Sequence, residues 1–467
     1  MSPSALPPAP RLACRPAPPV RLLLPRVRLL DPELGLDCLA DLLLDGGRIA
    51  AVGEDLPVPS GARVVEGAAG CAVFPGFVDI HAHLRTPGQE YKEDLASATR
   101  AAAAGGFVVV VGMANTDPVV DTGPLATWVL DQAAERASVR VGQVGAVSRG
   151  LRGEALAELR ELAEAGAAAF SDDGRPLRDV DLFLHALRYL RGTGRPVLLH
   201  LEEPSLSVDG VMHEGAWSAR LGLRGIPAVA EAGPLACALE VLRYAAAEAE
   251  RLGMPAPRMH VQHVSTAASV RLLRQAKAEG LPVTAEATPH HLLLTDARAS
   301  DFDQNCKTNP PLRAEGDRRE LAAALAEGVI DCIATDHAPH APHEKEVPFE
   351  EAPFGTVGLE TAFPALCAGL VESGALTLER LVAALSAEPC RCLGIAAPRL
   401  EVGTPADLCV VDLRETWEIS AADLHGKSRN AAFLGERARG RVLMTMVDGA
   451  PRHVAGRLRE EIDGVQE

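Results

Sequence analysis

Phe77-Val78-Asp79-Ile80-His81-Ala82-His83-Leu84-Arg85 is the stretch that decides how this chain folds. It follows Val73-Phe74-Pro75-Gly76, an apolar run typical of a buried strand. Side chains two positions apart on a strand point to the same face, so the imidazoles of His81 and His83 can converge on one metal ion. Taken alone, His81 and His83 could also be ordinary histidines on a half-polar strand. The residues that follow later strands decide between this interpretation and a pair of metal ligands.

Short apolar runs alternate with helical stretches through the middle of the chain. The runs span residues 72–80, 107–111, 139–147, 167–170, 196–201, 259–264, 283–287 and 329–334. The helical stretches include residues 93–104, 124–137, 154–165, 179–190 and 265–279. Eight strands alternating with helices predict a (β/α)8 barrel of the TIM type, whose functional groups lie at the C-terminal ends of the strands. An open doubly wound sheet is the alternative, but no Gly-x-Gly-x-x-Gly follows a strand, so dinucleotide binding has no support.

The two ends of the chain share a different pattern, short apolar runs separated by turn residues. Asp45-Gly46-Gly47 lies between two such runs and predicts a hairpin. We expect residues 21–73 and 400–455 to fold together as a small accessory β domain beside a barrel over residues 74–399. Residues 1–20, rich in Pro and Arg, and residues 456–467 are expected to be loose tails. The predicted fold class is α/β, a barrel with an accessory β domain built from both chain ends.

Composition excludes several classes of partner. The net charge of −17 over 467 residues argues against nucleic acid or an anionic membrane surface. No run of 18 apolar residues is present, and residues 1–20 lack the apolar core of a secretion signal. The ten cysteines are scattered without a Cys-x-x-Cys, which indicates free thiols in a reducing compartment. We therefore expect a cytoplasmic globular protein.

Polar residues suited to metal binding follow the predicted strands, as the barrel rule requires. They are His81, His83, Asp172, Asp173, His200, His263 and Asp336. Imidazole and carboxylate ligands without cysteine suit zinc, or manganese, iron or cobalt in its place. Because these ligands exceed the needs of one tetrahedral ion, we expect two ions that share a bridging hydroxide.

Two ions that share ligands usually need a bridging anion from the protein as well. Asp172 or Asp173 can supply it. The chain has five lysines, and none follows the fourth strand, so we do not expect a carbamylated lysine at this position.

Further residues near these strand ends suit catalysis and substrate binding. Asp336 can ligate an ion and also take a proton from the bridging water, although an ordinary turn aspartate is the alternative. Arg85 is a natural fork for a substrate carboxylate, unless it forms a structural ion pair. Asn115, Asn309 and His340 are uncharged or switchable donors that could complete this clamp.

Longer motifs carry a resemblance to a known family. They are Pro75–Arg85 as quoted above, Asn115-Thr116-Asp117-Pro118, Ser171-Asp172-Asp173-Gly174, Lys307-Thr308-Asn309-Pro310-Pro311-Leu312-Arg313, Ala334-Thr335-Asp336-His337-Ala338-Pro339-His340, Pro353-Phe354-Gly355 and Gly403-Thr404-Pro405-Ala406-Asp407-Leu408. Over residues 20–450 the chain resembles the dihydroorotases of the amidohydrolase superfamily, in particular the longer bacterial (type I) form. It departs from their usual pattern in Gly112-Met113-Ala114 before Asn115 and in Ala387-Glu388-Pro389, and neither departure affects a ligand.

The resemblance implies a role for each site residue. His81 and His83 match the ligands of the first metal, His200 and His263 those of the second, and Asp336 the catalytic ligand. Asp173 matches the bridging aspartate, because its spacing of 27 residues from His200 fits better than that of Asp172. The implied substrate contacts are His83, Arg85, Asn115, Asn309, His340, Phe354 and Gly355.

The implied activity is that of a zinc-dependent cyclic amidohydrolase with two Zn²⁺ per subunit. It cyclises N-carbamoyl-L-aspartate reversibly to (S)-dihydroorotate and water in pyrimidine (UMP) biosynthesis, by a metal-bridged hydroxide with Asp336 as general acid and base. The partner is this small molecule, and the resemblance leaves open a homodimer and a complex with aspartate transcarbamoylase. Two alternatives remain: a hydantoinase or allantoinase, and an inactive scaffold subunit of the transcarbamoylase. Residues 341–351 are either a loop over the site or an inert surface loop.

Overall fold

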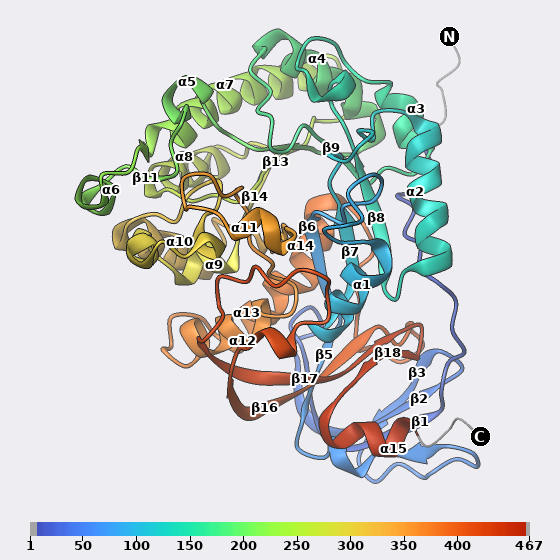
Figure 1. The fold of residues 1–467 in the computed structure, drawn as a ribbon. Coiled ribbons are helices and arrows are strands. Elements are labelled where there is room, and N and C mark those ends of the chain that lie inside the picture. Colours follow the sequence, from blue (N-terminus) through green and yellow to red (C-terminus); the bar gives the residue numbers. More distant parts are fainter. Residues whose placement is uncertain (1–6, 464–467) are drawn as a thin grey trace.

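The eight expected strands form one parallel barrel in the computed structural model, which describes residues 7–463 (Figure 1). In spatial order the strands are β6 (Phe77–Ala82), β7 (Phe107–Gly112), β8 (Arg140–Gly145), β9 (Ala169–Ser171), β10 (Val197–Leu199), β13 (Met259–Val261), β14 (Val283–Ala287) and β15 (Cys332–Ile333). The barrel closes just after β15, where the backbone N–H of His83 donates to the carbonyl of His337 at 2.8 Å. The fold class predicted from the sequence is confirmed.

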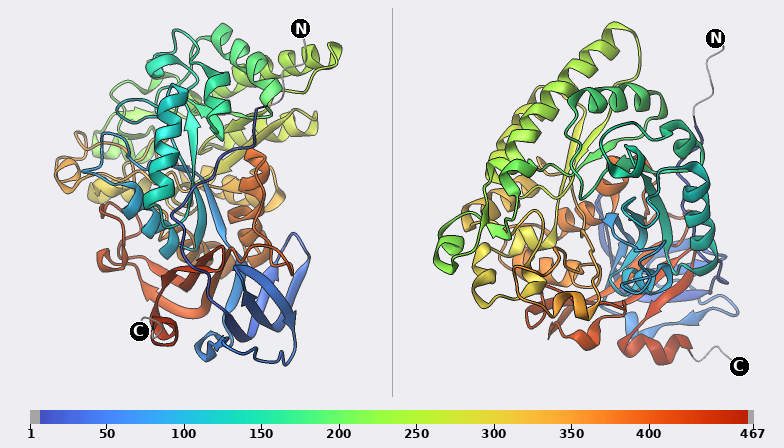
Figure 2. Two further views of the ribbon diagram at one scale, coloured as in Figure 1. Left: turned by 90° about the vertical axis from the view of Figure 1, so that its right-hand side faces the viewer. Right: turned by 45° about the horizontal axis from the view of Figure 1, so that its top comes forward.

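Helices surround the barrel and follow its strands (Figure 2). The longer ones are α1 (Leu95–Ala104), α2 (Gly123–Arg136), α4 (Val180–Leu190), α7 (Val229–Arg251), α8 (Ala267–Ala278), α10 (Glu315–Glu327) and α13 (Leu378–Leu385). The shorter ones are α3 (Leu159–Glu164), α5 (Pro204–Ser207), α6 (Ala216–Leu221), α9 (Pro289–Leu293), α11 (Pro342–Lys345), α12 (Ala362–Leu366) and α14 (Ala387–Leu393). Side-chain caps start several of them: Asp94 accepts from the N–H of Ser97, and Thr266 from that of Ser269.

The helix expected over residues 154–165 is shorter than predicted. Residues before α3 give their backbone hydrogen bonds to the loop after β8 instead. The N–H of Ala157 donates to the carbonyl of Val147, and the N–H of Arg149 to that of Ala155. Backbone groups bonded in this way are not free to form a helical turn.

The apolar run 72–80 is two strands, not one. Ala72–Pro75 (β5) belongs to the accessory sheet, and the barrel begins at Phe77. Gly76 lies at the break, where a Cβ atom would come 2.2 Å from Cγ1 of Val108. A side chain at this position would force the two sheets apart, so the glycine permits the sharp transfer of the chain between them.

The accessory sheet joins the two ends of the chain, below the barrel in Figure 1. Its order is β18 (Ala450–Val454), β17 (Arg437–Val447), β16 (Leu408–Glu418), β5, β1 (Leu22–Asp31), β2 (Leu36–Asp45) and β3 (Arg48–Gly53), with β4 (Arg63–Val64) beside β1. β5 pairs in parallel with β1 and antiparallel with β16, so it links the N-terminal and C-terminal halves. The expected hairpin at Asp45-Gly46-Gly47 connects β2 and β3.

Parts of the two expected tails pack against the rest of the chain. Ala13 and Val141 of β8 each donate a backbone N–H to the other's carbonyl, and the N–H of Arg11 donates to the carbonyl of Gly166. At the other end, α15 (Arg459–Asp463) packs beside the sheet, with Leu458 and Ile462 buried in its core. Apolar side chains within these segments explain the packing. Residues 1–6 and 464–467 lie outside the described residues.

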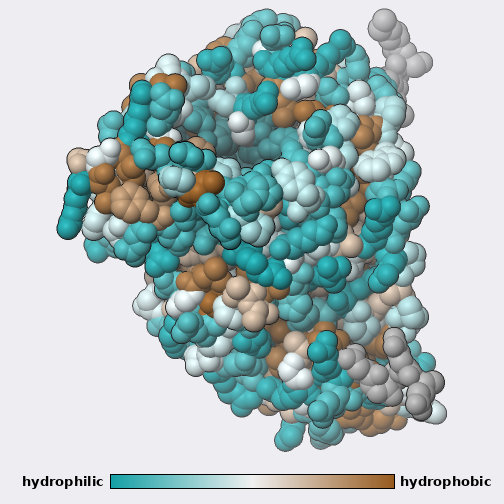
Figure 3. Space-filling model, viewed as in Figure 1, coloured by the Kyte–Doolittle hydropathy of each residue, from teal (hydrophilic) through white to brown (hydrophobic). Residues whose placement is uncertain are grey.

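Two further findings concern the surface and the thiols. Figure 3 shows that hydrophilic residues cover most of one face, with separate apolar areas between them. No helix within residues 7–463 has the length and apolar character needed to cross a membrane. All ten cysteines are free thiols.

Candidate metal centre and active site

The C-terminal ends of the barrel strands surround a cavity of about 260 Å³. Its walls are His83, Arg85, Asn115, Asp173, Gly174, His200, His263, Asn309, Asp336, Ala338, His340, Phe354 and Gly355. Every residue that the sequence assigned to substrate contact is among them. His81, the remaining predicted metal ligand, is fully buried beside them.

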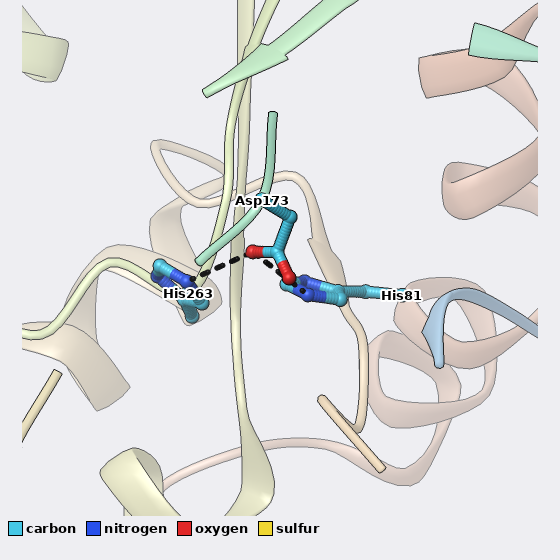
Figure 4. Close-up of side chains that lie close together, drawn as sticks. All are labelled: His81, Asp173 and His263. Atoms are coloured by element: carbon cyan, nitrogen blue, oxygen red, sulfur yellow. Dashed lines mark ion pairs between the residues drawn. The ribbon is translucent and has the colours of Figure 1, made fainter. Parts of the chain in front are cut away.

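Asp173 lies at the centre of the predicted ligands. Figure 4 shows its carboxylate between the rings of His81 and His263. Its Oδ1 lies 3.5 Å from Nε2 of His81, 3.5 Å from Nδ1 of His200 and 3.8 Å from Nε2 of His263. Its Oδ2 lies 3.5 Å from Nε2 of His83. One carboxylate therefore faces all four histidines.

Asp336 faces the same group from the end of β15. Its Oδ1 lies 3.1 Å from Nε2 of His83 and 3.5 Å from Nε2 of His81. Arg85, His263 and Asp336 have positive φ angles of 59°, 32° and 47°. Residues other than glycine rarely hold this conformation, and those that do are concentrated at functional sites. The backbone thus turns each of these side chains toward the cavity at some conformational cost.

The neighbouring Asp172 has a different role. Its carboxylate accepts hydrogen bonds from the backbone N–H groups of Val147 and Ser148, at 2.8 and 3.0 Å, and from the Ser148 hydroxyl. These bonds tie the end of β9 to the loop after β8. Of the two aspartates left open by residue type alone, only Asp173 faces the histidines.

The donor set fits metal ions. Two groups of three residues, His81–Asp173–His263 and His81–His83–Asp336, bring ligand atoms within 4.8 Å of one another. Most of the carboxylate–imidazole separations are 3.5–3.8 Å, which is too long for a hydrogen bond. Nitrogen and oxygen ligands of one zinc ion, bound at about 2.0–2.1 Å, stand roughly 3.3 Å apart. The spacing therefore suits donors that share cations.

The electrostatics of the cluster agree with this fit. Burial alone would raise the pKa of Asp173, but His81, His200 and His263 lower it well below its usual value. Burial likewise opposes ionisation of Asp336, yet His81 and His83 lower its pKa. Both carboxylates are therefore ionised at neutral pH and present negative charge to the cavity.

Arg85 forms no ion pair within 4.0 Å among residues 7–463, so the structural-ion-pair interpretation is not supported. Its Nε donates to the carbonyl of Pro339 at 3.1 Å. Burial lowers the pKa of its guanidinium to about 10, so the group stays cationic at neutral pH. A partly buried cation without a carboxylate partner, on the wall of a cavity, is suited to bind an anion.

His340 and the segment after it form the same wall. Nε2 of His340 lies 2.8 Å from the carbonyl of Phe354, which can only accept, so Nε2 carries the proton. Burial and the nearby Arg85 lower the pKa of His340 to about 3, which keeps the ring neutral. Lys307 donates to the carbonyls of Phe349 and Glu350, and so holds the segment that carries Phe354.

Sequence reasoning missed three residues that orient the site. Glu286 lies 2.5 Å from Nδ1 of His81, and Glu202 lies 3.1 Å from Nε2 of His200. Each carboxylate occupies one ring nitrogen and leaves the other to face Asp173. Asn430 donates to the carbonyls of Ala338 and Gly355 and accepts from the N–H of His340. Glu202 follows a predicted strand, but nothing in the sequence distinguished it or the other two from ordinary polar residues.

Comparison with known proteins identifies the family. Residues 72–451 match the amidohydrolase family, and the chain belongs to it. The dihydroorotase of Geobacter sp. (strain M21) is 44% identical over 94% of this chain and 100% of its own length. That of Anaeromyxobacter dehalogenans (strain 2CP-1) is 48% identical over 91% and 96% of the two chains. Within the amidohydrolases the chain is therefore a member of the dihydroorotase family, as the resemblance implied.

Solved structures agree on the fold. The L-hydantoinase of Arthrobacter aurescens superimposes with a TM-score of 0.81 at 25% identity, over 94% of this chain and 97% of that one. A D-hydantoinase of Thermus sp. gives 0.76 at 24% identity, over 93% and 96%. This likeness extends to the barrel and the accessory sheet together, because nearly the whole of each chain is covered.

Proposed function

We propose that the chain catalyses the reversible cyclisation of N-carbamoyl-L-aspartate to (S)-dihydroorotate and water. The observation that carries this proposal is the unpaired guanidinium of Arg85 in the same cavity as Asp173, Asp336 and the histidines. Hydrolysis of a cyclic amide needs the cluster of aspartates and histidines. The carboxylate of dihydroorotate gives the guanidinium of Arg85 a binding partner. The dihydroorotase relatives support the same activity.

We also propose two zinc ions per chain. The first would be held by His81, His83 and Asp336, the second by His200 and His263, and Asp173 would bridge them. When bound, zinc lowers the pKa of a water molecule and polarises the amide carbonyl. Nitrogen and oxygen donors that converge on one carboxylate support this assignment.

The chain's own residues bind the substrate and move the proton. Arg85 pairs with the substrate carboxylate, while Asn115, Asn309 and His340 are placed to hydrogen-bond the ring or its open form. In ring opening, the ionised Asp336 accepts a proton from the attacking water and returns it to the ring nitrogen as the C–N bond breaks. In ring closure the same proton travels in the opposite direction.

The alternatives fit the geometry less well. A hydantoinase or allantoinase is expected to have a carbamylated lysine at the centre of the ligands, and here Asp173 occupies that position. An inactive scaffold is expected to have lost ligands, whereas all six predicted ligands meet in one place. The homodimer, the complex with aspartate transcarbamoylase and the cytoplasmic location stay predictions from the sequence.

Substrate selectivity tests the proposal. The purified, zinc-loaded chain is expected to open dihydroorotate and to close N-carbamoyl-L-aspartate. It should open hydantoin and dihydrouracil, which lack the carboxylate, with kcat/KM at least about tenfold lower. Steady-state absorbance assays measure all four reactions. Faster turnover of hydantoin than of dihydroorotate would favour the hydantoinase alternative, and no turnover of any substrate would favour the scaffold.

Glu202→Ala is expected to weaken zinc binding by about 10- to 100-fold. Glu202 lies 3.1 Å from Nε2 of His200 and accepts from the Asn309 amide at 2.9 Å, so it positions one proposed ligand and one proposed substrate contact. Competition with a chromophoric chelator measures the affinity. Glu202→Gln keeps an acceptor oxygen and should lose less.

The matched control is Glu203→Ala, because the neighbouring Glu203 carboxylate bonds the backbone and hydroxyl of Ser205. This control should bind zinc like the unmodified chain. Equal affinity in the two alanine variants would show that Glu202 does not position the metal ligand.

A further inference from the structure

A second group of potential metal ligands lies deeper in the barrel than the catalytic cavity. It consists of His260 on β13, Glu286 on β14, Cys332 on β15 and Cys392 on α14, and we call it the thiol cluster. All four side chains are at most 1% exposed. His260 lies on β13, whereas His263 follows the end of that strand. None of the four residues lines the cavity, and Glu286 connects the thiol cluster to the catalytic centre through its contact with His81.

The separations within the thiol cluster match those of one tetrahedral ion. The two sulfur atoms of Cys332 and Cys392 lie 3.8 Å apart. Two thiolates bound to one zinc ion at about 2.3 Å are also roughly 3.8 Å apart. Nε2 of His260 lies 3.0 Å from Oε2 of Glu286, and the ligand atoms of these two residues and Cys332 lie within 4.8 Å of one another. Two sulfurs, one nitrogen and one oxygen thus converge.

Neighbouring contacts direct the correct atoms of His260 and Glu286 into the thiol cluster. Nδ1 of His260 lies 2.8 Å from the hydroxyl of Thr284, so its Nε2 faces the thiol cluster. Oε1 of Glu286 contacts His81, which leaves Oε2 to the cluster. Outer hydrogen bonds that fix the ring of a ligating histidine are a regular feature of metal sites.

Charge also favours a cation at this position. The hydrogen bond from Cys332 lowers the pKa of Cys392 to about 6. Burial acts in the opposite direction, and His260 lowers this pKa further. Burial raises the pKa of Cys332, so Cys392 is the one of the two thiols that is held as a thiolate, the form of cysteine that binds zinc.

We propose that His260, Glu286, Cys332 and Cys392 form a structural zinc site beneath the catalytic centre. Four protein ligands and full burial leave no position for substrate, which is the arrangement of structural rather than catalytic zinc. The site would fasten α14 to strands β13, β14 and β15. The proposal does not rest on the proposed function, because it concerns metal ligation by sulfur and not turnover.

Cobalt(II) provides a specific test. The full chain is produced in cells supplied with cobalt(II), so that the metal enters during folding, and its absorption spectrum is recorded. Sulfur ligation gives an intense thiolate-to-cobalt charge-transfer band in the near ultraviolet. The residues proposed for the catalytic centre are histidines and aspartates, which give no such band. We expect the band in the unmodified chain and expect zinc-grown protein to hold one more equivalent of zinc than the Cys332→Ser/Cys392→Ser variant.

Controls make the result decisive in either direction. Cys390→Ser changes another buried thiol on α14 and should keep both the band and the full metal content. If the double variant does not fold, the presence or absence of the charge-transfer band in the unmodified chain still tests the proposal. A cobalt-loaded chain without the charge-transfer band would overturn the proposal, because the thiols would then be only hydrogen-bonded. A Cys332–Cys392 disulfide, found by mass spectrometry of the unreduced chain, would overturn it as well.

Discussion

Asp336→Asn is expected to lower kcat for dihydroorotate ring opening by about 10²–10⁴-fold, the usual contribution of a positioned general acid and base. Asparagine preserves the size of the side chain and keeps one oxygen toward His83, from which the carboxylate now lies 3.1 Å. It also tolerates the φ angle of 47° at this position. The variant therefore removes the proton acceptor with little change to the backbone. Steady-state kinetics in both reaction directions measure the effect.

Two measurements separate loss of proton transfer from loss of metal. Elemental analysis of Asp336→Asn should show nearly the zinc content of the unmodified chain, because only one of several ligands has changed. Asp301→Asn, which changes an exposed aspartate outside the cavity wall, should leave the kinetics unchanged. Activity of Asp336→Asn within tenfold of the unmodified chain, at equal zinc content, would sink the assignment of Asp336 as the proton carrier.

The predicted ligands could be found from sequence because each obeys a short-range rule. His81 and His83 are two positions apart on a strand, and the other candidates directly follow apolar runs that became β9, β10, β13 and β15. In a parallel barrel, strand ends meet at one rim whatever the loops between them do. The rule places residues at the rim but does not orient them. Hence Asp172 and Asp173 could not be separated by residue type alone.

Other features depend on contacts between distant residues and have no local signal. Glu286 contacts His81 across 205 positions, and Asn430 holds His340 from 90 positions away. The break between β5 and β6 is invisible in the apolar pattern, because both strands are buried and only Gly76 separates them. The packing of the N-terminal segment was also missed, because its Pro- and Arg-rich composition predicts a loose tail and its backbone bonds go to residues more than 100 positions away, such as Val141.

Arg85→Gln is expected to reduce kcat/KM for dihydroorotate by about 30- to 1000-fold, which corresponds to roughly 2–4 kcal/mol for a buried charge contact. The same variant should change kcat/KM for dihydrouracil, which has no carboxylate, by less than about threefold. Arg85 lies on the cavity wall but is not a proposed metal ligand, so zinc content should be unchanged. For Arg85→Lys, kcat/KM for dihydroorotate should lie between the values of Arg85→Gln and of the unmodified chain, because an ammonium keeps the charge but not the planar fork.

The comparison of dihydroorotate with dihydrouracil separates a structural role of Arg85 from binding of the substrate carboxylate. If Arg85 only supported the fold through its bond to the carbonyl of Pro339, both substrates would lose activity equally. If Arg85 binds the substrate carboxylate, kcat/KM falls only for dihydroorotate, and the selectivity of the enzyme shifts toward uncharged rings. Arg152→Gln, an exposed arginine outside the cavity, is the matched control for loss of one positive charge. An equal decline on both substrates in Arg85→Gln would remove the physical reason for preferring dihydroorotate over other cyclic amides.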